Sequence, residues 1–206
     1  MLNRKFVFAP FIAAFVTAML LAGTANAAPD LDAEPFVVLK TSSDDLLAII
    51  KRDKAELAST PGAIYTLVRE KIEPIIDVPY MTALILGRHY RSSDEAQRDA
   101  FAISFSDQMI RRYADALLEY SNEEVRYEPA KPAKGEEKLK INSTVVPSSG
   151  VAVPLEYSMR KSKSDGRWKI YDVTIDGISM ITNYRTQFDS LIKRKGIDGV
   201  IADLKK

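Results

Sequence analysis

The chain has 206 residues, no cysteine and a nearly balanced charge, with 29 Lys and Arg residues against 28 Asp and Glu residues. Without cysteine the protein has no disulfide, thiolate nucleophile or thiolate metal ligand, so its stability depends on packing. A formal net charge of +1 lacks the basic excess that is typical of nucleic-acid-binding domains.

Residues 1–27 have the pattern of a secretory signal peptide. Arg4 and Lys5 precede an apolar stretch over 6–22, and residues 25–27 read Ala-Asn-Ala, a small-residue cleavage site. The alternative is an uncleaved anchor, but the apolar stretch is short for a span of about 20 residues. We therefore expect cleavage after Ala27, export of the mature chain, and one domain over 28–206.

The first two predicted helices cover residues 35 to about 73. One begins near Pro35, which is tolerated in a first helical turn, and runs to about residue 57, with residues 41–43 as a candidate break. The next is capped by Thr60, has Pro61 at its first position and ends before Pro74.

A short third helix is predicted over 79–86, closed by Gly87, and a long fourth helix follows it. Residues 92–95 read Ser-Ser-Asp-Glu and fit a capping box at the start of this fourth helix, which runs to about residue 119. Its apolar side chains recur at near-fourfold spacing: Phe101, Phe105, Met109, Tyr113 and Leu117.

Four strands are predicted next, over about 124–128, 139–146, 151–160 and 167–176. Short turns separate them, as in an antiparallel meander, and Pro154 indicates an edge or a bulge. In the last strand, alternation places Lys169, Tyr171, Val173 and Ile175 on one face and Trp168, Ile170, Asp172 and Thr174 on the other.

Two helices, about 178–194 and 197–205, complete the chain after Gly177. Helices followed by an antiparallel sheet indicate an α+β fold. The apolar face of the sheet and the apolar side of the long helix are compatible with an ordinary filled core and with a ligand cavity. Met81, Met109, Met159 and Met180 favour the cavity, because flexible thioethers adapt to variable apolar ligands.

Four segments, in this order, resemble the family of the periplasmic lipid carrier MlaC, also called the toluene-tolerance or Ttg2-type family. They are residues 79–91 (PYMTALILGRHYR), Gln97-Arg98 with Phe101, residues 168–188 beginning WKIYDVTIDGISMI, and residues 195–201 (KGIDGVI). The resemblance covers about the whole chain after the signal segment.

The resemblance implies an NTF2-like curved sheet whose helices enclose phospholipid acyl chains, with phospholipid as cargo and no cofactor. It also implies a monomer that shuttles lipid between an inner-membrane ABC transporter complex and an outer-membrane lipoprotein complex. This transport would maintain the lipid asymmetry of the outer membrane. The lipid-binding residues expected on this basis are Tyr80, Met81, Phe101, Phe105, Met109, Tyr113, Val145, Val153, Leu155, Tyr157, Met159, Tyr171, Val173, Ile175 and Met180.

Catalysis has little support in the sequence, so we expect no enzyme activity. His89 is the one histidine and there is no cysteine, so few pairs of a nucleophile and a general base are possible. No metal spacing or phosphate-binding loop is present. Two alternatives remain open: an NTF2-like cavity enzyme that uses Asp172 with Tyr171 or Tyr157, and an envelope adaptor that binds no lipid. Co-purifying lipid would separate both from a carrier.

Overall fold

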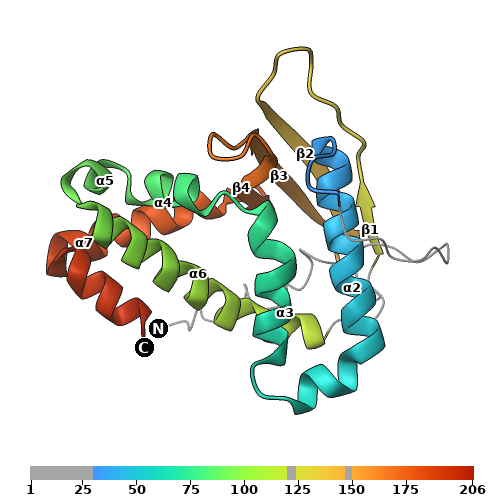
Figure 1. Ribbon diagram of the computed structural model, residues 1–206, viewed down its shortest axis with the longest axis horizontal. Coiled ribbons are helices and arrows are strands. Elements are labelled where there is room, and N and C mark those ends of the chain that lie inside the picture. The colour runs from blue at the N-terminus through green and yellow to red at the C-terminus, as the bar shows by residue number, and fades with distance from the viewer. Residues whose placement is uncertain (1–29, 120–123, 147–149) are drawn as a thin grey trace.

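A computed structural model describes residues 30–119, 124–146 and 150–206 of the chain (Figure 1). The predicted signal segment and its cleavage site lie outside these residues. The described helices are α2 (Pro35–Ser59), α3 (Ala63–Ile72), the short 3-10 helix η2 (Glu73–Ile75), α4 (Val78–Leu86), α5 (Arg88–Ser92), α6 (Glu95–Leu118) and α7 (Met180–Leu204).

The sheet has five antiparallel strands in the order β1-β2-β3-β4-β5, so the prediction of four strands is wrong in number. They are β1 (Glu124–Tyr127), β2 (Lys138–Val146), β3 (Val153–Lys161), β4 (Trp168–Ile175) and β5 (Ile178–Ser179). The extra strand forms because Asp176 and Gly177 both have positive φ, 48° and 77°, which is the geometry of a two-residue type I′ hairpin. The predicted α+β class is confirmed.

Strict alternation along β4 is also wrong, because a bulge interrupts it. Ser158 lies opposite Asp172 whereas Met159 lies opposite Ile170, so Tyr171 has no residue opposite it in β3. The extra residue shifts the alternation. Trp168 and Ile170 therefore share the core face with Val173 and Ile175, and Tyr171 leaves it.

Two predicted helix starts are corrected by the structure. Pro61 lies in a turn rather than in the second helix, which begins at Ala63 after Gly62 at φ 80°. The capping box of α6 is formed by Asp94 and Gln97: the Gln97 N–H donates to Asp94 Oδ1 at 2.8 Å, and the Asp94 N–H donates to Gln97 Oε1 at 3.2 Å.

The candidate break at 41–43 does not interrupt α2. The hydroxyls of Thr41 and Ser43 donate to the carbonyls of Val37 and Leu39, so both residues remain within the helix. The kink of α2 lies at Asp53, where the backbone is non-helical.

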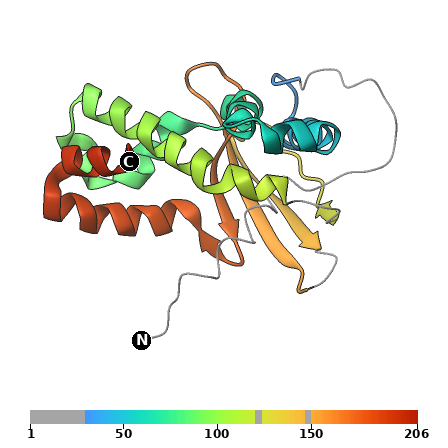
Figure 2. The same cartoon turned by 90° about the horizontal axis from the view of Figure 1, so that it is seen from below.

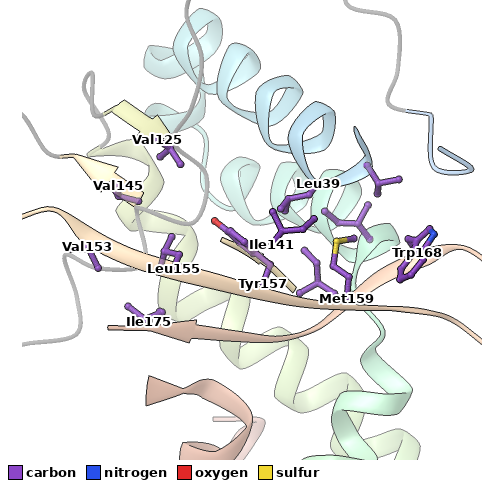
Figure 3. Packing of buried hydrophobic residues seen from close by; sticks show 13 residues of the cluster. Leu39, Val125, Ile141, Val145, Val153, Leu155, Tyr157, Met159, Trp168 and Ile175 are labelled. Carbon is purple, nitrogen blue, oxygen red and sulfur yellow. The ribbon is translucent and has the colours of Figure 1, made fainter. Parts of the chain in front are cut away.

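Helices cover one face of the sheet and extend beyond its edge (Figures 1 and 2). Helix α2 packs its Val38 and Leu39 on the sheet, where Ile141, Tyr157 and Met159 are fully buried (Figure 3). Helices α4, α6 and α7 pack against one another beside the β4–β5 end, and α3 joins α2 to α6. No helix in the described ranges is long and apolar enough to cross a bilayer.

Candidate functional site

The buried apolar residues form three separate clusters instead of one core. One lies between the sheet and α2, one among α4, α6 and α7, and one among α2, α3 and α6. Between them is a cavity of about 230 Å³. It is lined by Val68, Ile72, Glu73, Ile76, Val78, Met81, Ile85, Phe105, Ser106, Met109, Ile110, Tyr113, Ala114, Leu117, Leu155, Val173, Ile175, Met180, Ile181 and Tyr184.

Helix α6 provides the longest wall of this cavity. Its lining residues run from Phe105 to Leu117 at helical spacing, a stripe about 18 Å long at ~1.5 Å per residue. The helix is anchored at its start, where Phe101 stacks on Phe105 at 5.8 Å and meets Phe188 of α7 edge-on at 5.1 Å. The stripe is about as long as one leaflet of a bilayer core, roughly 15 Å.

The opposite wall combines the end of the sheet with the first turns of α7. Leu155, Val173 and Ile175 face the cavity from β3 and β4, and Met180 and Ile181 follow from α7. Asp172 fixes this junction: its carboxylate accepts from Ser179 Oγ at 2.6 Å and from the Ile181 N–H at 3.0 Å. The bulge in β4 and the type I′ hairpin thus aim the start of α7 at the cavity.

Few polar groups interrupt the lining, and they are Glu73, Ser106, Tyr113 and Tyr184. The hydroxyls of Tyr113 on α6 and Tyr184 on α7 lie 2.9 Å apart. Burial, and secondarily the bond to Tyr113, raises the pKa of Tyr184 well above its usual value. The Tyr184 phenol therefore stays protonated at neutral pH and adds no charge to the cavity.

Eight of the residues expected to bind lipid lie together in this cavity: Met81, Phe105, Met109, Tyr113, Leu155, Val173, Ile175 and Met180. The others lie elsewhere. Val145, Val153, Tyr157 and Met159 belong to the core between sheet and α2, and Phe101 belongs to the α4–α6–α7 cluster.

Tyr80 and Tyr171 lie outside the cavity, where their rings meet edge-on at 5.3 Å. Arg160 lies 4.0 Å over the Tyr80 ring. Since Arg160 follows Met159 on β3, it lies on the other face of the sheet. These two tyrosines connect α4 to that outer face.

Several lining residues were missed by sequence reasoning. Ile110 and Ala114 continue the helical stripe of α6, so its spacing could have revealed them. The contributions of α3 and the following turn, Val68, Ile72 and Ile76, have no comparable signal. They reach the cavity because Ile76 pairs with Ile170 of β4, a long-range bridge.

The candidate catalytic residues do not form a reactive site. The carboxylate of Asp172 accepts a hydrogen bond from Ser179 just before α7. His89 Nε2 lies 2.9 Å from Asp189 Oδ1 on the surface formed by α5 and α7. Neither residue lines the cavity. Within residues 30–119, 124–146 and 150–206, no group of three or more His, Asp or Glu side chains is placed to hold a metal.

Known proteins are similar to this chain in sequence, and a solved structure is similar to it in fold. The intermembrane phospholipid transport system binding protein MlaC of Haemophilus influenzae is 27% identical over 206 residues, covering 100% of this chain and 93% of that protein. The toluene tolerance protein ttg2D of Pseudomonas putida is 27% identical over 165 residues, 80% of this chain and 75% of that protein.

A solved structure of a phospholipid-binding protein from Ralstonia solanacearum, in complex with a phospholipid, matches with a TM-score of 0.75 and 32% identity. The match covers 84% of this chain and 95% of that one. The MlaC protein family profile matches residues 40–206. Because this match spans most of the chain, the chain belongs to the MlaC family.

Proposed function

We propose that this protein is a phospholipid carrier that holds acyl chains in the cavity between the sheet and helices α3, α4, α6 and α7. The observation that carries the proposal is the cavity itself, apolar and about 18 Å long on the α6 side. The similarity to a protein solved with a bound phospholipid supports it.

The cavity size suits a hydrocarbon chain. At roughly 10–15 Å³ per water-sized group, a cavity of about 230 Å³ has room for roughly 15 to 23 such groups. A methylene is of similar size, so the space corresponds to one acyl chain. A second chain requires α6 to separate from the sheet or from α7.

The energetics suit transfer in both directions. Moving two acyl chains out of water is worth on the order of 20 kcal/mol at ~0.8 kcal/mol per CH₂. Relative to a bilayer the gain is near zero, because the chains are already out of water there. The carrier can therefore take up and release lipid, and net direction must come from its partners.

The signal-like segment and the family support a proposal for the compartment and the partners. We propose export to the periplasm, with exchange between an inner-membrane ABC transporter complex and an outer-membrane lipoprotein complex. The name of the Haemophilus relative, an intermembrane transport system binding protein, supports this placement. In this role a monomer would maintain outer-membrane lipid asymmetry without a cofactor.

Lipid extraction of the purified protein tests the proposal. Native mass spectrometry of the exported form should show a phospholipid adduct that organic extraction removes. A protein that is isolated without lipid, and that takes up none from phospholipid vesicles, would contradict the carrier function and favour the adaptor alternative.

Two matched valine substitutions test the location of the site. Val173 lines the cavity, whereas Val153 is buried in the cluster between the sheet and α2 and does not line the cavity. Val173→Trp should exclude lipid while changing stability little, because the indole enters free space. Val153→Trp should retain lipid but lower the free energy of unfolding by about 1–3 kcal/mol, since it overpacks a filled core. Equal lipid loss in both variants would contradict this assignment.

The cavity-enzyme alternative is disfavoured by the geometry. It needs Asp172 beside Tyr171 or Tyr157 at a substrate, but the carboxylate of Asp172 binds the start of α7. None of these three residues lines the cavity.

A further inference from the structure

The hydroxyls of Tyr113 and Tyr184 on the cavity wall have one O–H donor that their mutual hydrogen bond does not use. Tyr113 and Tyr184 share a single hydrogen bond of 2.9 Å, and two hydroxyls carry two protons. One proton is used between them, which leaves the second for another acceptor. The Tyr184 ring is held between Phe105 at 5.0 Å and Phe188 at 6.0 Å, so the hydroxyl pair has a defined place on the wall whichever of the two hydroxyls keeps the spare proton.

A cation lies next to the same pair. The guanidinium carbon of Arg112 is 5.7 Å from the centre of the Tyr113 ring, and its charge also acts on the Tyr184 phenol. Arg112 is exposed and Tyr113 is partly exposed, so this part of the wall reaches solvent. In the described part of the chain, Arg112 forms no ion pair with a carboxylate.

The acidic residues of α6 near Arg112 already have partners on α3. Asp107 pairs with Arg69 of α3, and Asp115 accepts from the Tyr65 hydroxyl at 3.0 Å. The adjacent Arg111 donates to the Leu204 carbonyl at 3.1 Å. Of the two neighbouring arginines, Arg112 is thus the one left for an external anion beside the apolar cavity.

We propose that Arg112 and the Tyr113–Tyr184 hydroxyl pair bind the phosphodiester of the bound phospholipid while its acyl chains fill the cavity. The inference rests on the proposed function. It adds the residues by which the protein discriminates a phospholipid from other diacyl lipids. A phosphodiester supplies both a negative charge for the guanidinium and an acceptor oxygen for the spare hydroxyl. A neutral diacylglycerol with the same chains supplies neither at that position.

A competition between these two lipids tests the inference. Delipidated protein is incubated with vesicles of phosphatidylcholine that contain diacylglycerol with the same two acyl chains. Bound lipids are then extracted and quantified by mass spectrometry. The ratio of the two bound lipids, relative to their ratio in the vesicles, measures the preference for the phosphodiester.

Wild-type protein should prefer phosphatidylcholine, and Arg112→Gln and Tyr113→Phe should each reduce this preference roughly two- to tenfold. Arg112→Lys should restore most of it. Tyr184→Phe removes the other hydroxyl and keeps the packing of the ring. Arg194→Gln is the matched control, because Arg194 is an exposed arginine of α7 ten residues beyond the last lining residue, Tyr184.

The outcomes separate the inference from the proposed function. Uptake of both lipids without preference, or an unchanged preference in folded Arg112→Gln and Tyr113→Phe, contradicts the phosphodiester site and leaves the carrier function standing. A wild-type protein that takes up neither lipid contradicts the carrier function and this inference together.

Discussion

At the scale of single residues, Asp172 connects the sheet to the cavity. It lies on the polar side of β4, as alternation predicts for that position, but it is not a solvated surface charge. Its two oxygens accept from Ser179 Oγ and from the Ile181 N–H. A carboxylate at the first turn of a helix satisfies a free N–H and interacts favourably with the helix dipole.

Asp172→Asn should therefore lower the free energy of unfolding by about 1–2 kcal/mol, because an amide replaces one acceptor by a donor. Displacement of Met180 and Ile181 should also reduce bound lipid. Denaturant unfolding with lipid quantification checks both effects. Asp176→Asn is the control, since Asn is well tolerated at positive φ in this hairpin; equal stabilities for the two variants would count against the capping role.

His89 belongs to a surface charge cluster centred on Asp189. Lys193, Arg88 and His89 hold the pKa of the Asp189 carboxyl well below its ordinary value of 3.8. A carboxyl with a lowered native pKa stabilises the fold above its ordinary value, and this contribution is lost as the pH falls toward the native value.

Asp189→Asn should thus lower the melting temperature at neutral pH, and its difference from the wild type should shrink as the pH falls below 3.8. Thermal unfolding over a pH series measures this. A difference that is constant across the series would show that packing, and not charge, is responsible. Because neither His89 nor Asp189 lines the cavity, His89→Ala should leave lipid occupancy unchanged.

At the scale of elements, the turn inside α7 completes the α4–α6–α7 cluster. Gly196 has φ 72° and ψ 169°, so the helix changes direction there, and the last segment turns back toward α4 and α6 (Figure 2). Val200, Ile201 and Leu204 then pack with Ile85 and Phe101. Asp198 accepts from Gln97 Nε2 at 3.0 Å, which joins the segment to α6.

The two glycines of this segment should respond differently to alanine. Gly196→Ala should lower the free energy of unfolding by about 1–3 kcal/mol, because residues other than glycine rarely adopt that backbone conformation. Gly199 is helical, and an added Cβ would lie 3.1 Å from the Cβ and 3.2 Å from the Cγ of Lys195, a tight contact that a small shift of the Lys195 side chain relieves. Gly199→Ala should be neutral or stabilising by up to about 1 kcal/mol. Chemical denaturation compares them, and a smaller loss for Gly196→Ala than for Gly199→Ala would contradict the strained-turn explanation.

At the scale of the whole molecule, three apolar clusters surround one cavity. Side chains on the cavity wall lack packing partners on one side, which costs dispersion energy. A bound acyl chain supplies those contacts and links the three clusters. Removal of the lipid is therefore expected to lower the free energy of unfolding of the whole domain.

Adding lipid back to delipidated protein at about 100 times the dissociation constant should stabilise it by roughly 2.7 kcal/mol. For a domain of this size the melting temperature should rise by roughly 5–11 °C, at about 2–4 °C per kcal/mol. Differential scanning fluorimetry measures the shift. Val173→Trp should show little of it, and an equal shift in that variant would place the lipid outside the cavity.

Much of the fold was accessible from the sequence alone. Local signals determined the α+β class, the long helix with its Phe101–Leu117 spacing, the closure of α4 at Gly87, and the segments that resemble the MlaC family. These depend on residues that are close in the chain: periodicity, caps and turns. The same periodicity could have added Ile110 and Ala114 to the α6 wall of the candidate site.

Tertiary structure alone decided which apolar residues border free space. Val153 and Val173 look alike in the sequence, yet one lies in the packed core under α2 and the other faces the cavity. The bulge that removes Tyr171 from the core face depends on pairing with β3, and the place of Ile76 depends on its bridge to Ile170. Alternation predicts the face of a sheet, but only the packing of distant helices determines whether that face is filled.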